Sequence, residues 1–292
     1  VYVVGVSVDI LAAVRAHGGR LVGPNCLGIA VAEPSLNATF GSRALPPGSI
    51  GFSSQSGALG LALLEKASGR SLGFSSFISV GNKADVSAND LLEYWEDDEG
   101  TELVALYLES FGNPRRFGRF ARRVARQKPI LAMKSGTSRA GARAAGSHTA
   151  ALAGSEEAVD ALFHQAGVLR VTTLEELIDA AALLSIQPLP GGRRVAILTN
   201  AGGLGILCSD ACETAGLELS ELTQETTSKL RELLPAEASL ANPVDMLGSA
   251  TAASYEAALP ILLADPQVDS LIVLFVPPGT ASVEDVAEGI AQ

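Results

Sequence analysis

Two titratable side chains in this sequence stand where catalysis could use them, His148 and Glu109. His148 lies in a long, glycine-containing polar loop, residues 134–154, that follows a stretch typical of a buried strand. The loop carries three cationic side chains, Lys134, Arg139 and Arg143. A histidine placed there can act as a general base, a nucleophile or a metal ligand. No cysteine or second histidine is nearby in sequence, so nothing supports a metal site.

Glu109 directly follows an apolar stretch, residues 103–108, at the carboxyl end of a predicted strand. A carboxylate there either caps a helix or forms a salt bridge, or it shares a reactive edge with the His148 loop; the residue type alone does not decide between these roles. The other two histidines, His17 at a helix end and His164 within a helix, favour structural roles.

Two turns of similar composition each lead from a buried strand into a helix. They are Ser54-Gln55-Ser56-Gly57 and Thr199-Asn200-Ala201-Gly202-Gly203, at a constant offset of 145 residues. The first N–H groups of a helix have no partner within it, and together with the helix dipole they attract an anion. One such turn could be an ordinary helix cap. Two matched turns favour phosphate binding at both helix starts.

The elements that must position these turns are strands alternating with helices. We expect buried strands at Leu21-Val22, 49–53, 74–80, 103–108, 129–133, 194–199 and 270–276. Helical patterns lie between most of them, at 58–68, 90–96, 115–127 and 174–184. Strands that are apolar throughout indicate parallel sheets covered on both faces. The predicted fold class is therefore α/β.

Proline- and glycine-rich breaks at 43–48 and 187–192 divide the chain. They bound two duplicated α/β units, 48–187 and 193–292. We expect the motif Asn82–Asp85 in the first unit to correspond to Asn242–Asp245 in the second. Residues 1–47 are too short for a domain and resemble the end of a further α/β unit. Because the chain starts at Val1 and stops inside an expected helix, residues 282–292, we expect a trimmed fragment whose second unit is truncated.

Composition excludes several classes of protein. The 292 residues hold 21 basic and 32 acidic side chains, a net charge of −11, which argues against nucleic-acid and anionic-membrane partners. Hydrophobic residues make up 47% and charged residues 18%, as in a globular protein. Three cysteines give no disulfide framework. Neither a membrane-length apolar run nor a signal peptide is present, so we expect a cytoplasmic location.

Six motifs, in this order, make the chain similar to the NDP-forming acyl-CoA synthetases, and most similar to the α part of the ADP-forming acetyl-CoA synthetases. The superfamily includes succinyl-CoA synthetase. The motifs are Gly23-Pro-Asn-Cys-Leu-Gly28, Ser53-Ser-Gln-Ser-Gly-Ala-Leu59, Ser79-Val-Gly-Asn-Lys-Ala-Asp85, Tyr107-Leu-Glu109, Gly146-Ser-His148-Thr-Ala-Ala151 and Asn242-Pro-Val-Asp245.

The resemblance implies a ligase that interconverts acyl-CoA, phosphate and NDP with free acid, CoA and NTP through a phosphohistidine. His148 matches the phosphorylated histidine and Glu109 the acid that orients it. The two helix starts match paired helices whose positive ends face the phosphoryl group; these are Ser54, Gln55, Ser56, Gly57, Asn200, Ala201, Gly202 and Gly203. Such converging donors suit a phosphoryl transition state.

The implied fold is two flavodoxin-like, parallel-sheet domains, 48–187 and 193–292, preceded by the end of a CoA-binding Rossmann domain, 1–47. Asn25 and Cys26 match positions near the CoA thiol. The implied partner is an ATP-grasp (β) subunit or domain, absent from this chain, which would bring ADP or ATP and Mg²⁺; an oligomer is expected. Some relatives instead use this module as an acyl-CoA-sensing regulator of a GNAT acetyltransferase. Because His148 and Glu109 are both present, we favour the ligase.

Overall fold

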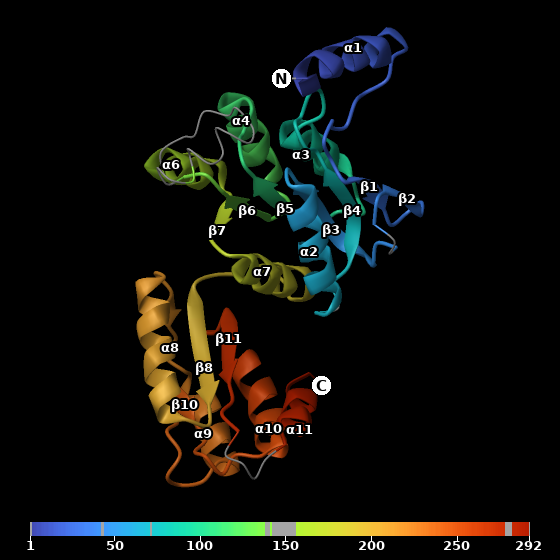
Figure 1. The fold of residues 1–292 in the computed structure, drawn as a ribbon. Coiled ribbons are helices and arrows are strands. Elements are labelled where there is room, and N and C mark those ends of the chain that lie inside the picture. Colours follow the sequence, from blue (N-terminus) through green and yellow to red (C-terminus); the bar gives the residue numbers. More distant parts are fainter. Residues whose placement is uncertain are drawn as a thin grey trace. The chain divides into compact units, whose positions relative to one another are not determined.

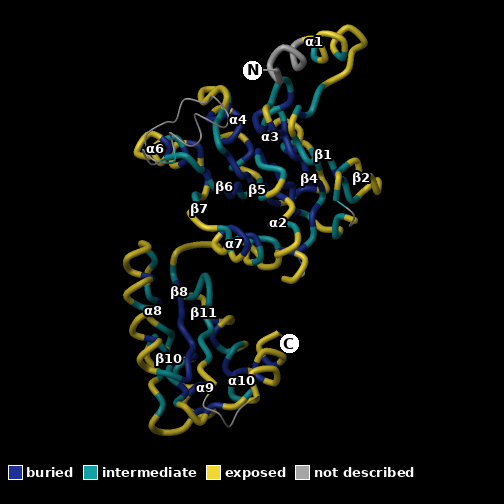
Figure 2. Tube along the Cα trace, viewed as in Figure 1, coloured by how far each residue is buried: buried dark blue, intermediate teal, exposed yellow. Residues whose placement is uncertain are grey.

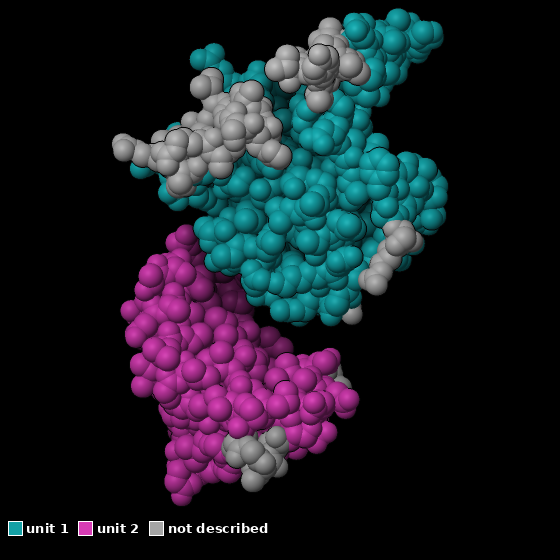
Figure 3. Space-filling model, viewed as in Figure 1, with its two compact units in different colours: residues 1–188 teal, residues 189–292 magenta. Residues whose placement is uncertain are grey.

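The computed structural model describes residues 2–41, 44–70, 72–137, 141, 156–277 and 282–291, with side chains from residue 9 onward. The chain divides into two compact units, residues 1–188 and 189–292 (Figure 3). His148, Arg139 and Arg143 lie outside the described residues.

The first unit is built on a seven-stranded sheet of order β2-β1-β4-β3-β5-β6-β7 (Figure 1). Strands β3 to β7 are parallel, whereas β1 pairs antiparallel with β2 and with β4. The strands are β1 (Gly28–Val31), β2 (Leu36–Thr39), β3 (Pro47–Ser54), β4 (Phe74–Ser79), β5 (Leu103–Leu108), β6 (Ile130–Lys134) and β7 (Leu169–Val171).

The five parallel strands follow the flavodoxin-like order 2-1-3-4-5, counting from β3. The order reverses between β3 and β5, whose register pairs Ser54 with Tyr107. In open α/β sheets, ligands bind outside the carboxyl ends of the strands at this reversal. The residues that follow Ser54 and Leu108 therefore stand at the ligand-binding edge, and the expected α/β class with a parallel sheet is confirmed.

Both faces of this sheet are covered by helices, as fully apolar strands require (Figure 2). Val104, Leu106 and Leu108 of β5 pack in one core cluster with residues of α3 (Ala88–Asp97), α4 (Pro114–Val124) and α6 (Glu156–Ala166). The alternate residues Leu103, Ala105 and Tyr107 pack in a second cluster with α2 (Gly57–Ser68) and α7 (Leu174–Ile186). This alternation is the two-residue period of a strand.

Several helices of the first unit begin at residues whose side chains accept a backbone N–H of the first helical turn. The Ser56 hydroxyl accepts the N–H of Leu59 at the start of α2. The Asn113 side chain accepts the N–H of Arg116, and Pro114 is the first residue of α4. Thr173 and Glu176 form a reciprocal capping box at the start of α7.

The second unit has a smaller, fully parallel sheet in which β10 and β11 flank β8 and a short β9 also pairs with β8. One core cluster joins β8 to the helices α9, α10 and α11, and another joins it to α8. The elements are β8 (Arg194–Thr199), α8 (Gly202–Thr214), β9 (Glu218–Leu219), α9 (Gln224–Leu233), β10 (Val244–Asp245), α10 (Ala252–Leu263), β11 (Ser270–Leu274) and α11 (Val283–Ala291).

The N-terminal segment differs from its expectation. Helix α1 (Tyr2–Ala16) is followed by an irregular stretch, so the strand predicted at Leu21-Val22 is wrong. The Leu21 N–H donates to the Asp85 carboxylate, and the Leu21 carbonyl accepts a single hydrogen bond, from the Val86 N–H. Strands β1 and β2 were not predicted, because each has four residues and β2 is mostly exposed. They extend the sheet of the first unit.

The repeat is visible in the register, with one correction. In the first sheet Ser79 lies opposite Ser54, and in the second Asp245 lies opposite Thr199, the residue 145 positions after Ser54. Asp245 therefore corresponds to Ser79, and the expected equivalence of Asn82–Asp85 with Asn242–Asp245 is wrong. Helix α9 lies between β9 and β10, so residues in corresponding positions of the two sheets no longer keep the constant offset of 145 at this point.

Among the described residues, no helix combines the length and apolar character needed to cross a membrane.

Candidate functional site

A polar cavity of about 340 Å³ opens beside the carboxyl edge of the first sheet. It brings together side chains or backbone from four of the six sequence motifs. Its lining is Asn25, Cys26, Leu27, Phe40, Gln55, Ser56, Gly57, Ala58, Gly81, Asn82 and Glu109. The expected substrate residues Asn25 and Cys26 thus share one cavity with Glu109 and with the turn that opens α2.

The Gln55 side chain links the ends of β3 and β5, where the strand order reverses. Its Oε1 accepts the N–H groups of Glu109 at 2.8 Å and Ser110 at 2.9 Å, and its Nε2 donates to the Ser110 carbonyl at 2.6 Å. The side chain is buried, so the three bonds form away from bulk water. Gln55 therefore fixes the backbone from which the Glu109 side chain projects.

The start of α2 presents unpaired donors to the same cavity. The Ser56 hydroxyl caps the N–H of Leu59 at 3.3 Å, and the Ser56 carbonyl accepts the N–H of Gly60. No described residue accepts the N–H of Gly57 or Ala58, both of which line the cavity. Free N–H groups at the positive end of a twelve-residue helix attract anions.

Asn25 and Cys26 are held against the carboxyl end of β4. The Pro24 carbonyl accepts the N–H of Asn82, and the Ser79 hydroxyl accepts that of Leu27. Gly81 has a φ of +51°, and a Cβ there would lie 2.2 Å from the Asn25 carbonyl oxygen, so only glycine permits this approach. Burial raises the pKa of the Cys26 thiol, which keeps it protonated near neutral pH.

Two lysines bond to the backbone at Glu109 and Ser110. Lys134 is buried and donates to the Glu109 carbonyl at 2.9 Å, while Lys83 donates to the Ser110 carbonyl at 3.0 Å and to the Ser110 hydroxyl. Burial lowers the pKa of Lys83 to about 8, although the Glu109 charge acts in the opposite direction. Burial also lowers the pKa of Lys134. Both lysines interact electrostatically with Glu109 and offset its charge where an anionic ligand would approach.

The second expected turn, at the start of α8, repeats the hydroxyl-to-carbonyl bond of the first, from Thr199 to Ala201, but has no side-chain cap. Asn200 is buried and exchanges two hydrogen bonds with Val276, 2.8 and 2.9 Å, which joins the ends of β8 and β11 as Gln55 joins those of β3 and β5. No described residue accepts the N–H groups of Gly202 and Gly203. The charge nearby is different, because a Cβ on Gly202 would lie 2.8 Å from Oδ2 of Asp245. That carboxylate already complements the helix dipole and opposes a second anion.

The structure separates the expected residues into three groups. Asn25, Cys26, Gln55, Ser56, Gly57 and Glu109 line one cavity. Ser54 is fully buried and donates to the Ser56 carbonyl, so it shapes the turn without reaching the cavity. Asn200, Ala201, Gly202 and Gly203 belong to the second unit.

Sequence reasoning missed Lys83 and Ser110 as neighbours of the site. Lys83 lies four residues after the end of β4, and Glu109 lies directly after the end of β5. A polar residue that follows a buried strand was the signal used for Glu109, and it would have found Lys83 as well. In the described part of the chain, His, Cys, Asp and Glu side chains nowhere form a group of three that could hold a metal ion.

Chemically, the cavity combines an anion site with a carboxylate. The free N–H groups of α2 can bind phosphate oxygens, and the Glu109 carboxylate can orient an imidazole or accept a proton beside them. The Asn25 amide, which donates to Asn82 at 3.4 Å, lines the same cavity.

Two family models match the chain, one to each unit. The family described as "Succinyl-CoA ligase like flavodoxin domain" matches residues 47–184, and the family described as "Ligase-CoA domain" matches residues 195–280. Together they account for most of the chain.

Relatives and solved structures agree with these families. The α subunit of acetate–CoA ligase [ADP-forming] II from Pyrococcus furiosus is 44% identical, over 97% of this chain and 62% of its own length. The 4-hydroxybutyrate–CoA ligase [ADP-forming] from Nitrosopumilus maritimus is 39% identical, over 95% of this chain and 40% of its own length. The dinucleotide-forming acetyl-coenzyme A synthetase 1 of Ca. Korarchaeum cryptofilum, solved with phosphate and ADP, superposes with a TM-score of 0.93 at 37% identity, covering 98% of this chain and 62% of that one. The chain thus spans less than two thirds of the length of these relatives.

Proposed function

This chain belongs to the family of NDP-forming acyl-CoA ligases, and from that premise we propose that it is the α-type component of an ADP-forming acyl-CoA ligase. The proposed reaction converts acyl-CoA, phosphate and ADP into free acid, CoA and ATP, and it is reversible. The substrates named for the relatives, acetate and 4-hydroxybutyrate, support a carboxylic acid as the product.

The reaction proceeds in three steps. A phosphate oxygen attacks the acyl carbonyl carbon, the carbon–sulfur bond breaks, and CoA leaves as its thiol. A ring nitrogen of His148 then takes the phosphoryl group from the acyl phosphate and releases the acid. Finally the phosphoryl group passes from His148 to ADP.

The described residues have defined tasks in this scheme. The N–H groups of Gly57 and Ala58 bind the phosphate, and their dipole stabilises charge on the phosphoryl oxygens in the transition state. Glu109 accepts one imidazole N–H of His148, which fixes the tautomer and leaves the other nitrogen as the nucleophile. Asn25 and Cys26 face the CoA thiol end. Gln55 keeps Glu109 in place through its three backbone bonds.

The observation that carries the proposal is the single cavity lined by Asn25, Cys26, Gln55, Ser56, Gly57 and Glu109. It places an anion site, a carboxylate and the expected thiol-end residues at the sheet edge where this fold binds ligands. The acyl carbon, the phosphate and the histidine have to meet at one such point.

Partners follow from the reaction. ADP and Mg²⁺ need a nucleotide site, which we assign to an ATP-grasp subunit or domain. Residues 1–47 are proposed to be the end of a CoA-binding domain, with 48–187 and 193–292 as the two succinyl-CoA synthetase-like domains. An oligomer of this chain with its ATP-grasp component is the proposed working form, and a cytoplasmic location suits its substrates.

Phosphohistidine formation tests the proposal. The chain is incubated with its ATP-grasp component, Mg²⁺ and γ-labelled ATP, and the label is followed after acid and base treatment. We expect an acid-labile, base-stable label that His148→Ala abolishes. The matched control His164→Ala removes an exposed histidine of α6 and should leave the label unchanged.

The opposite result would identify the other function. If the wild-type protein binds acyl-CoA but never acquires label, the ligase proposal fails and an acyl-CoA-sensing regulatory module of an acetyltransferase becomes the better reading. Label that persists in His148→Ala would overturn the assignment of His148 alone.

A further inference from the structure

Asp85 is a buried carboxylate that has no task in the proposed reaction. It is the last residue of the third sequence motif, and its side chain is only 2% exposed. Oδ1 accepts a hydrogen bond from Arg15 at 2.8 Å, and Oδ2 accepts two, from Nε of Arg20 and from the Leu21 N–H, both at 2.9 Å. Among the described residues, the donors to this carboxylate thus all belong to residues 15–21.

This carboxylate is ionised in the folded protein. Burial acts to raise the pKa of the Asp85 carboxyl, yet the hydrogen bonds from Arg15, the Leu21 N–H and Arg20 hold that pKa well below its usual range. Hydrogen bonds to an ionised acceptor are stronger than those between neutral groups. Asp85 is therefore a firm anchor for the backbone at Leu21.

From Leu21 the chain runs along residues 80–86, the loop that follows β4, and enters the polar cavity. Three N–H groups of this loop donate to carbonyls of residues 21–24 at 2.9–3.0 Å; the pairs are Val86 with Leu21, Ala84 with Gly23 and Asn82 with Pro24. Asn25 and Cys26 come next, and both line the cavity. Asn25 has a φ of +55°, a conformation that the surrounding structure must hold in place.

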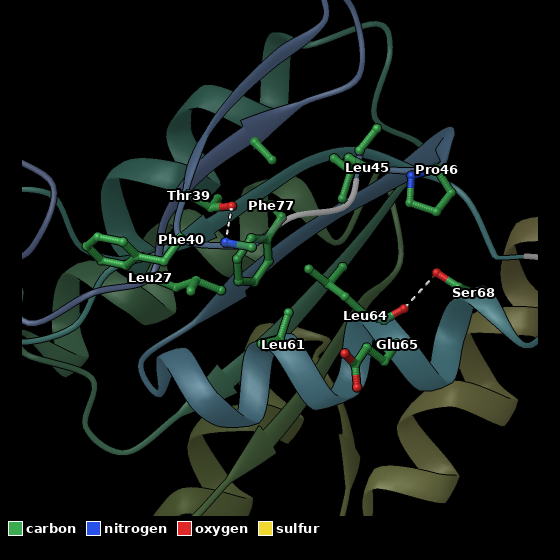
Figure 4. Close-up of a pocket in the computed structure, with 13 residues that line it drawn as sticks. Leu27, Thr39, Phe40, Leu45, Pro46, Leu61, Leu64, Glu65, Ser68 and Phe77 are labelled. Atoms are coloured by element: carbon green, nitrogen blue, oxygen red, sulfur yellow. Dashed lines mark hydrogen bonds between the residues drawn. The ribbon is translucent and has the colours of Figure 1, made fainter.

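Leu27 anchors the other end of this stretch. Its N–H donates to the Ser79 hydroxyl at 3.0 Å, and its side chain packs against the core, lining one pocket with Phe40 and Phe77 (Figure 4). Residues 25 and 26 thus lie between an apolar anchor at Leu27 and an ionic anchor at Asp85. The ionic anchor can be removed without opening the core.

We propose that Asp85 is a positioning residue for the thiol end of CoA, because the backbone that it holds leads directly into the cavity. The inference rests on the proposed function, in which Asn25 and Cys26 face that thiol. The carboxylate is not part of the cavity lining, so it acts through the chain that follows Leu21. It serves the step in which the CoA sulfur bonds to the acyl carbon and phosphate leaves, and it has no part in phosphoryl transfer between ATP and His148.

Separating these two steps tests the proposal. The complete ligase, with its ATP-grasp component, is assayed for the rate at which γ-labelled ATP labels His148, which needs no CoA, and for kcat/KM with CoA as the varied substrate. In Asp85→Asn we expect kcat/KM for CoA to fall about tenfold, because a misplaced reactant slows the reaction, while the labelling rate stays within about twofold of the wild type.

Asp269→Asn is the matched control. Asp269 likewise accepts a backbone N–H and a guanidinium, both from Arg194, but it belongs to the second unit. It should leave both measurements unchanged. Arg20→Gln weakens the Asp85 anchor through a side chain that is mostly exposed, so the fold tolerates it, and it should lower kcat/KM for CoA by a smaller factor than Asp85→Asn.

Alkylation of Cys26 reports the placement of this stretch independently of catalysis. The thiol is partly buried, so a loosened backbone should expose it to iodoacetamide. Peptide mapping should show Cys26 modified several-fold faster in Asp85→Asn than in the wild type. Cys208, a partly buried thiol of the second unit, should be modified at the same rate in both.

The failures of the two proposals are distinguishable. If the wild-type enzyme acquires label, and Asp85→Asn slows labelling and the CoA step equally or slows neither, the positioning role is overturned and the ligase stands. If the wild-type enzyme never acquires label, the ligase fails, and alkylation alone decides the anchor. An unchanged rate at Cys26 in Asp85→Asn then overturns it, and a faster rate supports it.

Discussion

At residue 109 a carboxylate projects from a backbone that is held from three directions. Gln55 accepts its N–H, Lys134 donates to its carbonyl, and the Ser110 carbonyl next to it accepts a bond from Lys83. A side chain that only capped a helix would not need such a rigid base. The arrangement suits a group whose position relative to a substrate matters.

Replacing Glu109 tests its proposed role. Glu109→Gln keeps the shape of the side chain but removes the charge that stabilises a protonated imidazole, so the rate of phosphohistidine formation should fall about a hundredfold. Rapid-quench labelling measures that rate. Glu102→Gln is the control, because Glu102 is exposed just before the opposite end of β5 and should have no effect. Equal rates in the wild type and Glu109→Gln would refute the role.

Lys83 predicts a pH dependence of phosphate binding. Its pKa of about 8 lies below the ordinary 10.5 because the side chain is buried, so the folded protein loses this cation between pH 7 and 9. We expect the KM for phosphate to rise several-fold over that range, whereas Lys83→Arg should keep its charge and a flat profile. An identical rise in Lys83→Arg would assign the effect to another group.

The same pKa shift affects stability with a definite sign. Below pH 8 the folded chain carries a buried charge that the unfolded chain exposes to water, which costs stability. Between pH 8 and 10.5 the unfolded chain binds the additional proton, so this cost is relieved as the pH rises.

At the scale of elements, one buried amide joins two strand ends in each unit. Gln55 connects the ends of β3 and β5, and Asn200 connects those of β8 and β11. Each closes the place where the strand order reverses, so the helix start beside it has a fixed direction.

Removing the amide should destabilise the first unit. Gln55→Ala leaves the N–H groups of Glu109 and Ser110 without their acceptor, and we expect unfolding free energy to fall by about 2 to 3 kcal/mol. Urea denaturation followed by fluorescence of Trp95, the single tryptophan and fully buried in the first unit, reports the change. Gln127→Ala, at an exposed glutamine after α4, is the control and should change stability little. An unaltered midpoint in Gln55→Ala would show that the N–H groups find other partners.

The long apolar strands and their helices could be predicted from sequence, and the short ones could not. β5 was predicted at its observed limits because six consecutive apolar residues fill a strand buried on both faces. β10 has two residues and is set by its register with β8, which no local pattern encodes. The site divides in the same way. Gln55 and Glu109 directly follow strands with a clear apolar pattern. Asn25 is brought near both by hydrogen bonds between distant parts of the chain, in which the Ser79 hydroxyl accepts the N–H of Leu27 and the Asn82 N–H donates to the Pro24 carbonyl.

The molecule consists of two units, each of which has a separate hydrophobic core. None of the four core clusters found among the described residues mixes side chains from the two units. A cooperative fold needs such a core, and each unit supplies it from its own sequence.

A fragment of residues 1–188 should therefore fold alone. We expect Trp95 to stay buried, with blue-shifted fluorescence and a cooperative urea transition whose midpoint is close to that of the full chain, because both clusters around the first sheet are complete. A broad, non-cooperative transition in the fragment would contradict independent cores. The variant Gln55→Ala should lower the midpoint equally in the fragment and in the full chain.

Ser79 in the first sheet and Asp245 in the second occupy corresponding positions, and this difference breaks the internal symmetry of the duplication. Two identical copies would offer an anion two degenerate helix ends, with no reason to prefer either. The Asp245 carboxylate beside the start of α8 removes that degeneracy, so the two helix starts are unequal. The difference at this one strand position therefore gives the two duplicated helix starts different affinities for an anion.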